Sequence, residues 1–326
     1  MELRPLGRSG LWVGRLGLGT GTWTRGTDEY EARDQLAAFL DAGGTLIDTA
    51  DSYADGDAEG LLGELVEEFE VRDEVVLATK AGAVGGGDRR VNTSRHHLLR
   101  ALEGSLRRLR TETVDLWHLH AWDPWTPLEE TLAAVDAAVS SGKVRYAGVS
   151  NYSGWQMSRA AAWQQALGRA PLVTTQVEYS LLERGIEREV VPAAQGAGMG
   201  ILPWSPLGRG VLTGKYRHSM PIDSRGASPE SAAWVHTYLD ERGRRIVDAV
   251  ATAAEGLGAS PTEVSLSWLR DRPGVVAPIL GARTTTQLIA ALASEELVLP
   301  DEILTALDDV SAPLLGYPES GWAQRR

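Results

Sequence analysis

Short apolar segments alternate with segments of helical periodicity along this 326-residue chain. Eight such segments, each too short for a helix and followed by a helical pattern, predict a parallel sheet covered by helices. Eight strands close into a (β/α)8 TIM barrel, an α/β fold, whereas a doubly wound open sheet is the alternative. The expected strands begin near Leu16 and then cover residues 46–48, 75–80, 114–120, 144–150, 172–177, 200–204 and 274–278.

Besides the barrel, the sequence predicts an N-terminal hairpin and a long loop, but no second domain. Residues 3–13 carry a Gly-Arg-Ser-Gly turn between short apolar segments, which predicts an N-terminal β-hairpin. Residues 216–240 mix Pro, Ser, Gly, Met and Trp with few periodic apolar positions. They predict a long loop after the seventh strand, mobile without ligand and able to close over the barrel mouth. No linker or repeat divides the chain, so residues 1–326 are expected to form a single domain.

The net charge of −12 and the sequence pI of about 5.1 argue against nucleic acid or an anionic membrane as a general partner. The sequence has no apolar run of bilayer length and no signal-peptide core, which favours a cytoplasmic protein. Cysteine is absent, so disulfides and thiolate metal sites are excluded, and no metal is expected. Homo-oligomerisation stays open.

Polar side chains stand at the ends of consecutive expected strands. Asp48 ends the second strand, Lys80 the third and His120 the fourth, and Tyr53 follows Asp48 by one loop turn. Because the carboxyl ends of barrel strands share one rim, these side chains should converge where barrel enzymes carry their chemistry. Of the 32 basic residues only three are lysines, so a lysine at a strand end is a candidate for chemistry of its own.

Several motifs together cover most of the chain. They are Asp48 with residues 51–63, then residues 77–80, 114–120, 142–151, 176–180, 204–215 and 278–284. In these motifs the chain resembles the aldo-keto reductase superfamily, and in particular its bacterial and potassium-channel β-subunit-like branch. Two departures stand out: Ala54 replaces a common glycine, and Ala290-Ala291 occupy positions where many members have a Glu-Asn pair near the adenine.

The resemblance implies hydride transfer between a nicotinamide and a carbonyl carbon, which requires a general acid near the carbonyl oxygen. Tyr53 is the expected proton donor. A free phenol has a pKa of about 10; the Lys80 ammonium should lower it, while Asp48 holds the lysine charged and oriented. His120 is expected to orient and polarise the carbonyl. His118, two residues earlier on the strand, is expected to be structural.

The resemblance also implies a nicotinamide cofactor, NADP(H) rather than NAD(H). Barrels often bind phosphate in the loops after strands seven and eight, where Lys215 and Arg283 are the candidates, and Arg283 is expected to grip the 2′-phosphate. Trp204 offers a flat face to the nicotinamide; as an alternative, it plugs the barrel. Three residues match positions that hold the carboxamide group of the nicotinamide in the family: Ser150, Asn151 and Gln176. The other expected cofactor residues are Thr22, Trp23, Ser205, Leu207, Gly210, Gly281 and Gln287.

Trp23, Trp122 and Trp125 are expected to wall a pocket for a small carbonyl compound, either an apolar or aromatic aldehyde, a ketone or a sugar-like carbonyl. Two other classes of protein stay open. A cofactor-sensing regulatory subunit with little turnover would share the fold and many of the motifs. A phosphate-binding isomerase or aldolase would use Lys80 as a Schiff base, which Asp48 beside it disfavours.

Overall fold

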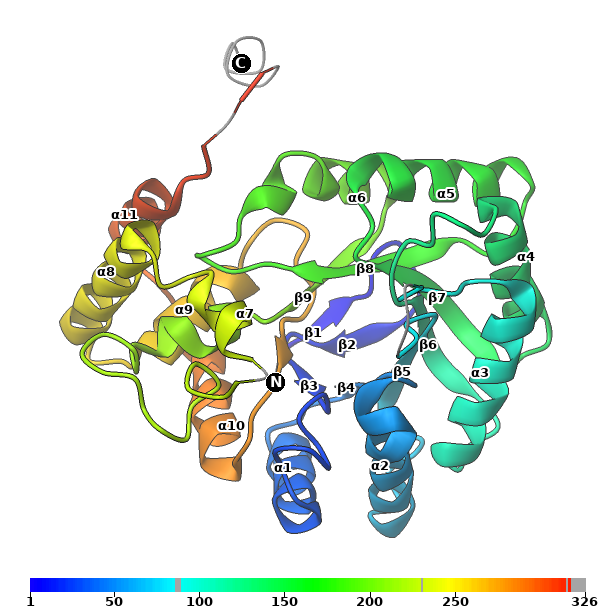
Figure 1. Cartoon of the computed structure of the whole chain (residues 1–326), viewed down its shortest axis with the longest axis horizontal. Helices are drawn as coiled ribbons and strands as arrows, with labels where there is room; N and C mark the ends of the chain where they lie inside the picture. The colour runs from blue at the N-terminus through cyan, green and yellow to red at the C-terminus, as the bar shows by residue number, and fades with distance from the viewer. Residues whose placement is uncertain (86–88, 230, 315, 318–326) are drawn as a thin grey trace.

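An eight-stranded parallel sheet curls into a nearly closed barrel with helices outside it (Figure 1). The structure is a computed structural model and describes residues 1–85, 89–229, 231–314 and 316–317. The strands are β3 (Gly17–Gly19), β4 (Leu46–Asp48), β5 (Val76–Ala81), β6 (Val114–Leu119), β7 (Val144–Ser150), β8 (Leu172–Glu178), β9 (Gly200–Trp204) and β10 (Ile279–Leu280). They follow the chain order around the barrel, with β10 beside β3. The predicted TIM barrel is thereby confirmed.

The last strand differs from the prediction, which placed it at residues 274–278. The chain first bridges β9, where Val275 pairs with Ile201. It then crosses to the other neighbour: the Pro278 carbonyl accepts a hydrogen bond from the Gly17 N–H (2.9 Å), and β10 pairs with β3. Because Pro278 has no N–H to extend the first ladder, the closing strand is split between its two neighbours.

Side chains cap several helices at the residue that precedes them. Asp28 accepts a hydrogen bond from the Glu31 N–H (2.9 Å), and Ser260 forms a reciprocal capping box with Glu263. Each cap satisfies an N–H that has no partner within its helix. The helices that pack outside the strands are α1 (Glu29–Asp41), α2 (Asp57–Glu68), α3 (Arg95–Arg108), α4 (Leu128–Ser140), α5 (Gly154–Ala166), α6 (Val190–Ala197), α9 (Pro261–Arg270) and α10 (Thr285–Leu292).

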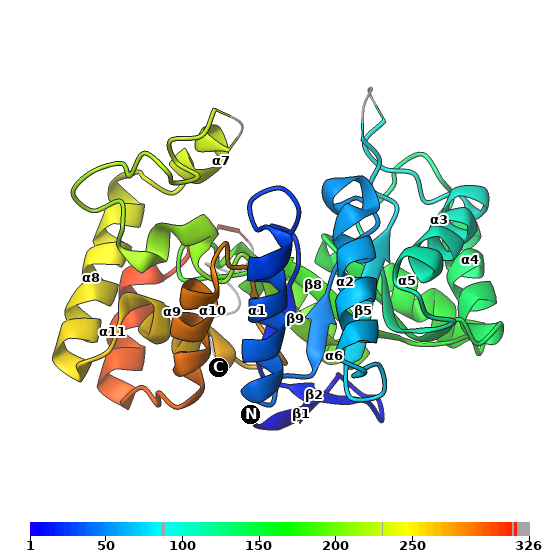
Figure 2. The ribbon, with the colours of Figure 1, turned by 90° about the horizontal axis from the view of Figure 1, so that it is seen from below.

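The predicted N-terminal hairpin is present, formed by β1 (Leu3–Pro5) and β2 (Trp12–Gly14) in antiparallel pairing. It lies at one end of the barrel, opposite the end that carries α7 (Ala232–His236) (Figure 2). Leu6 and Val13 join a hydrophobic cluster that continues into the barrel strands. The hairpin therefore covers the amino-terminal end of the strands, and their carboxyl ends form the opposite rim.

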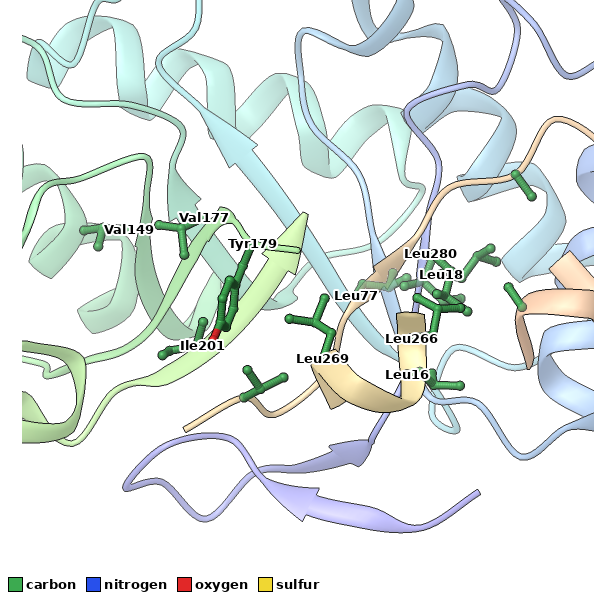
Figure 3. Close-up of a cluster of buried hydrophobic side chains, with 14 of the residues drawn as sticks. Leu16, Leu18, Leu77, Val149, Val177, Tyr179, Ile201, Leu266, Leu269 and Leu280 are labelled. Atoms are coloured by element: carbon green, nitrogen blue, oxygen red, sulfur yellow. The ribbon is translucent and has the colours of Figure 1, made fainter. Parts of the chain in front are cut away.

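A larger hydrophobic core lies between the strands and the outer helices. Figure 3 shows Ile201 and Leu280 from the strands in this core with Leu266 and Leu269 from α9. All four side chains are buried, and each buried leucine or isoleucine stabilises the fold by about 1.5–3 kcal/mol. This packing fixes the strand ends that carry the polar residues.

The connection after β9 carries more structure than the predicted loop. Residues 216–240, predicted as a loop, contain the short helix α7; η3 (Gly208–Thr213) precedes this stretch and α8 (Glu241–Leu257) follows it, and residue 230 lies outside the described residues. Figure 1 shows α8 and α11 (Asp301–Ser311) outside the ring of barrel helices. The remaining 3-10 helices are η1 (Tyr53–Gly56), η2 (Gly185–Glu187) and η4 (Ala293–Glu295). In the described part of the chain, no helix is both long and apolar enough to span a membrane.

Candidate active site

A cavity of about 680 Å³ opens at the carboxyl ends of the strands. The residues predicted for the site that line it are Thr22, Asp48, Tyr53, His120, Ser150, Asn151, Gln176, Trp204, Ser205, Leu207, Gly210, Lys215, Gly281, Arg283 and Gln287. Lys80 is fully buried and touches two of these residues. The barrel therefore brings residues from six consecutive strand ends to one place.

Lys80 is the centre of a buried hydrogen-bond network. Its ammonium donates to Asp48 Oδ2 (2.6 Å), to the Thr49 carbonyl (2.8 Å) and to the Tyr53 hydroxyl (3.3 Å). The other Asp48 oxygen accepts a hydrogen bond from the side-chain amide of Gln176 (2.8 Å). All three ammonium protons and both carboxylate oxygens have partners, which is the condition under which a buried ion pair is tolerated.

The charges of this network decide where its protons lie. Burial disfavours the Lys80 ammonium, but Asp48 and Tyr53 outweigh it, so the pKa of Lys80 is raised and the lysine is charged. Burial also raises the pKa of Tyr53; Lys80 acts to lower it and Asp48 to raise it. The lysine acts in the predicted direction, but the prediction of a lowered phenol pKa is wrong because burial dominates. Tyr53 keeps its proton at neutral pH.

A tight turn delivers Tyr53 to the cavity. Ala54, Asp55 and Gly56 follow it with φ angles of 49°, 56° and 100°, all in the left-handed region. Glycine adopts this conformation freely, whereas an alanine costs roughly 1–2 kcal/mol there. Ala54 occupies the position where the sequence departs from a common glycine, so this departure places strain directly beside the tyrosine.

The two histidines of β6 and its end have different surroundings. The His120 ring packs edge-on against Tyr53, with centroids 6.0 Å apart at 78°. Burial and the charge of Lys80 lower the pKa of His120 to about 3, so the ring is neutral and can donate an N–H to a carbonyl oxygen. His118 is fully buried, and its Nε2 lies 2.9 Å from Thr174 Oγ1. Burial followed by the Lys80 charge also lowers the pKa of His118.

Asn151 links three of the strand ends. Its backbone is left-handed, with φ 57°, a conformation that asparagine tolerates better than most residues. Its side-chain amide donates to the His120 carbonyl (3.0 Å) and to Ser150 Oγ (3.1 Å), and its Oδ1 accepts from the Trp204 indole (3.0 Å). These bonds hold Trp204 half-buried in the cavity wall, so this indole is not a plug inside the barrel.

Three cations line the cavity without a described carboxylate as ion-pair partner: Lys215, Arg225 and Arg283. Arg283 Nη1 donates to the Asp223 carbonyl (2.7 Å), and the Arg283 N–H donates to Gln287 Oε1 (3.0 Å). Burial and the charge of Arg283 lower the pKa of Arg225, against an opposing effect of Tyr216. No sequence pattern pointed to Arg225, which lies in the segment expected to be a loop. In a chain of net charge −12, this cluster suits an anionic ligand such as phosphate.

The tryptophans predicted to wall the substrate pocket lie elsewhere. Trp23, also expected to contact cofactor, is buried in the core. Trp122 packs edge-on against neighbouring aromatic rings, and Trp125 is 76% exposed. Within the described residues, none of the three lines the cavity, whereas Trp234 of α7 lines it together with Trp204. Nearness in sequence to a strand end did not suffice, because Trp23 packs into the core, Trp122 packs against other rings and Trp125 faces solvent.

A TIM barrel whose strand ends converge on a cavity with buried acid–base groups is the architecture of a barrel enzyme. Residues 15–312 match the family model described as "Aldo/keto reductase family". The chain belongs to the aldo/keto reductase family.

Individual relatives support the same assignment. The chain is 37% identical to the uncharacterized oxidoreductase YrpG of Bacillus subtilis (strain 168), over 95% of this chain and 96% of the relative. It is 33% identical to the aldo-keto reductase YhdN of the same organism, over 89% and 87%. It is also 33% identical to a probable voltage-gated potassium channel subunit beta of Oryza sativa subsp. japonica, over 98% of each chain. The family and the oxidoreductase relatives support carbonyl reduction in general, and the predicted resemblance is confirmed.

Proposed function

We propose that this protein reduces aldehydes or ketones to alcohols with NADPH, using Tyr53 as the general acid. The observation that carries the proposal is the contact of the Tyr53 hydroxyl with the buried Lys80–Asp48 pair at the wall of the cavity. A phenol that keeps its proton, beside a fixed ammonium, suits the donation of that proton to a carbonyl oxygen. The ammonium then stabilises the phenolate left behind.

The neighbouring residues have supporting roles in the proposal. Asp48 keeps Lys80 charged and holds it 3.3 Å from the phenol oxygen. His120 is neutral and presents an N–H that orients and polarises the carbonyl. A bound nicotinamide cofactor supplies the hydride. His118 has no part in the chemistry and fills the barrel interior.

The residues present fit such a cofactor. Its phosphates would be held by the three cations that have no carboxylate partner among the described residues, Lys215, Arg225 and Arg283. Trp204 would offer its exposed face to the nicotinamide, and the residues that would hold the carboxamide are Ser150, Asn151 and Gln176. Arg283 would favour NADPH over NADH, because a guanidinium binds a 2′-phosphate through two parallel hydrogen bonds.

The proposal also includes a small-molecule substrate, a cytoplasmic location and a single domain over residues 1–326.

Substitution of the acid tests the proposal. Tyr53→Phe should lower the rate of NADPH-dependent carbonyl reduction by about 10²–10⁴-fold, the usual effect of losing a general acid. Binding of NADPH, measured by quenching of tryptophan fluorescence, should stay nearly unchanged. Lys80→Met should also slow reduction, because the phenolate then loses its stabilising charge. Normal turnover by Tyr53→Phe would contradict the assignment of this tyrosine.

A regulatory subunit is the second candidate function, because the chain is similar to a channel subunit. Measuring NADPH turnover by the wild-type protein distinguishes it from a reductase. A reductase consumes NADPH steadily with at least one member of a panel of aldehydes, ketones and quinones. A regulatory subunit would bind NADPH without steady turnover.

A further inference from the structure

Glu59, in the first turn of α2, carries a fully buried carboxylate. One of its oxygens accepts a hydrogen bond from the Thr79 hydroxyl (2.5 Å), and the other contacts two nitrogens of the Arg108 guanidinium (2.6 and 2.8 Å). These three residues form the Glu59 cluster. A single buried carboxylate therefore joins α2 to β5 and to the end of α3.

One contact of the Glu59 cluster reaches the strand that carries Lys80. Thr79 directly precedes Lys80, and successive side chains of a strand point to opposite faces. Lys80 points into the barrel, where its ammonium meets Asp48 and Tyr53, whereas Thr79 points outward to Glu59. The cluster therefore holds β5 from outside, at the residue next to the lysine.

Another contact of the cluster reaches the turn that carries Tyr53. This turn ends at Gly56, where α2 begins, and a Cβ at Gly56 would lie 2.7 Å from Arg108 Nε. The guanidinium thus packs directly against the backbone of the turn, and Glu59 lies in the helical turn that follows it. Two non-glycine residues of the turn are left-handed, and strain of this kind persists only where the surroundings hold the backbone.

Stability alone is a weak explanation for the Glu59 cluster. Loss of hydration cancels much of the attraction within a buried ion pair, so apolar residues of similar volume often stabilise a fold as well. The cluster does provide a fixed relation between β5 and the turn that leads into α2. These two segments present the Lys80 ammonium and the Tyr53 hydroxyl, which lie 3.3 Å apart.

We propose that Thr79, Glu59 and Arg108 are positioning residues for the acid–base groups. From outside the barrel they hold the Tyr53 phenol in contact with the Lys80 ammonium. This proposal rests on the proposed function, in which the phenol donates the proton. In the described part of the chain, none of the three positioning residues lines the cavity, so they act only through the groups they hold. A misplacement of about 1 Å with a remote cause can lower a rate by roughly a hundredfold.

Substitutions of Thr79 test the proposal without changing any charge. Thr79→Val keeps the shape of the side chain and removes the hydroxyl, so Glu59 no longer holds β5. The rate of carbonyl reduction in a single turnover with NADPH bound should fall by about tenfold, whereas the Kd for NADPH should change by less than about twofold. Thr79→Ser retains the hydroxyl and should retain most of the rate.

Glu59→Gln is the second variant. The Arg108 side chain is 35% exposed, so removal of the carboxylate charge leaves no cation fully buried. Glu59→Gln should lower the single-turnover rate at least as much as Thr79→Val does. Combining the two substitutions should lower it little further, because both break the same link.

Asp115→Asn is the matched control. Like Glu59, Asp115 pairs with an arginine, Arg72 (3.0 Å), and bonds β5, where it accepts a hydrogen bond from the Leu77 N–H (2.9 Å). This bond lies toward the amino end of β5, away from Lys80. Asp115→Asn should therefore leave the single-turnover rate close to that of wild type.

Nuclear magnetic resonance reads the contact without requiring turnover. Tyrosine is labelled at the ring carbon that bears the hydroxyl, and the Tyr53 signal is assigned by its loss in Tyr53→Phe. At neutral pH this signal should move in Thr79→Val and Glu59→Gln and keep its wild-type position in Thr79→Ser and Asp115→Asn.

An unmoved Tyr53 signal in Thr79→Val would overturn the proposal, and so would a wild-type rate of reduction in that variant. Equal losses of rate in Thr79→Val and Thr79→Ser would also overturn it, because the hydroxyl would then have no role. If wild type reduces no carbonyl compound, yet the signal moves in Thr79→Val and not in Thr79→Ser, the proposed function fails and the positioning role stands.

Discussion

Replacing Asp51 with asparagine should change how the stability of the protein depends on pH. Asp51 lies just after β4, and its Oδ1 is buried with no hydrogen-bond partner among the described residues. Burial and the negative charge of Glu59 raise the pKa of Asp51 to about 7, against weaker opposing effects of Arg108 and Lys80. Arg108 bonds Glu59 at 2.6 and 2.8 Å, whereas no cationic side chain among the described residues bonds Asp51 in this way.

The size of the effect follows from the pKa. An aspartate ordinarily has a pKa of 3.8, so between about pH 4 and pH 7 the folded protein binds one proton more than the unfolded chain. Its stability therefore falls as pH rises through this window. A rise of the pKa from 3.8 to about 7 corresponds to about 4 kcal/mol in total, of which about 2–3 kcal/mol is lost between pH 5 and pH 8. Asparagine cannot ionise and avoids this loss.

Urea unfolding at pH 5 and at pH 8, followed by tryptophan fluorescence, measures the effect. Relative to wild type, Asp51→Asn should gain about 2–3 kcal/mol in free energy of unfolding between the two pH values. Asp55→Asn is the matched control, because it makes the same change in the same loop at a side chain that is 91% exposed. A difference between Asp51→Asn and wild type that is equal at both pH values would refute the view that burial holds this carboxyl protonated.

Two further predictions concern the cofactor. Wild type should prefer NADPH to NADH by about 1.5–3 kcal/mol, or roughly ten- to hundred-fold, and Arg283→Ala should remove most of this preference while NADH use changes little. Equal use of both cofactors by wild type would contradict the role of Arg283. Limited proteolysis should cut the long loop near Ile222, which is 95% exposed, and spare α7, because Arg209 bonds the Trp234 carbonyl of α7 as well as Glu178 at the rim. NADPH should slow the cut, whereas equal rates with and without it would argue against closure of this loop.

The Asp48–Lys80 ion pair could be predicted from sequence because parallel barrel strands have fixed geometry. Asp48 ends β4 and pairs in register with Ala78 of β5, so Lys80, two residues further, points to the same side and reaches closer to the rim. Its long side chain turns back to Asp48 at 2.6 Å. The spacing of the strands therefore brings the Lys80 ammonium to the Asp48 carboxylate. The short turn after β4 brings the Tyr53 hydroxyl to the same place.

Trp234 of the cavity could not be predicted in this way, whereas Trp204 could, because it ends a strand. Trp234 is placed by Arg209 and Glu178, and no local pattern shows that these segments, distant in sequence, will meet. Trp122 follows β6 closely, but its ring packs against Tyr152 in the loop after β7 and Trp155 in α5. The net pKa shift of Tyr53 was also missed, because sequence motifs show which charges are neighbours but do not show how deeply a phenol is buried.

Asp48 acts to raise the pKa of both Lys80 and Tyr53, so it favours the protonated form of each. Burial, the largest influence on the phenol, acts with it, so lysine and tyrosine both hold their protons at neutral pH. That state suits the proposed carbonyl reduction, in which Tyr53 would give up its proton. Alcohol oxidation instead needs a phenolate to accept a proton, so its kcat should climb between about pH 7 and about pH 10, while that of reduction stays level until the phenol ionises. Tyr53→Phe should remove this difference between the two directions. Oxidation by wild type that is as fast at pH 7 as at pH 10 would mean that another group accepts the proton.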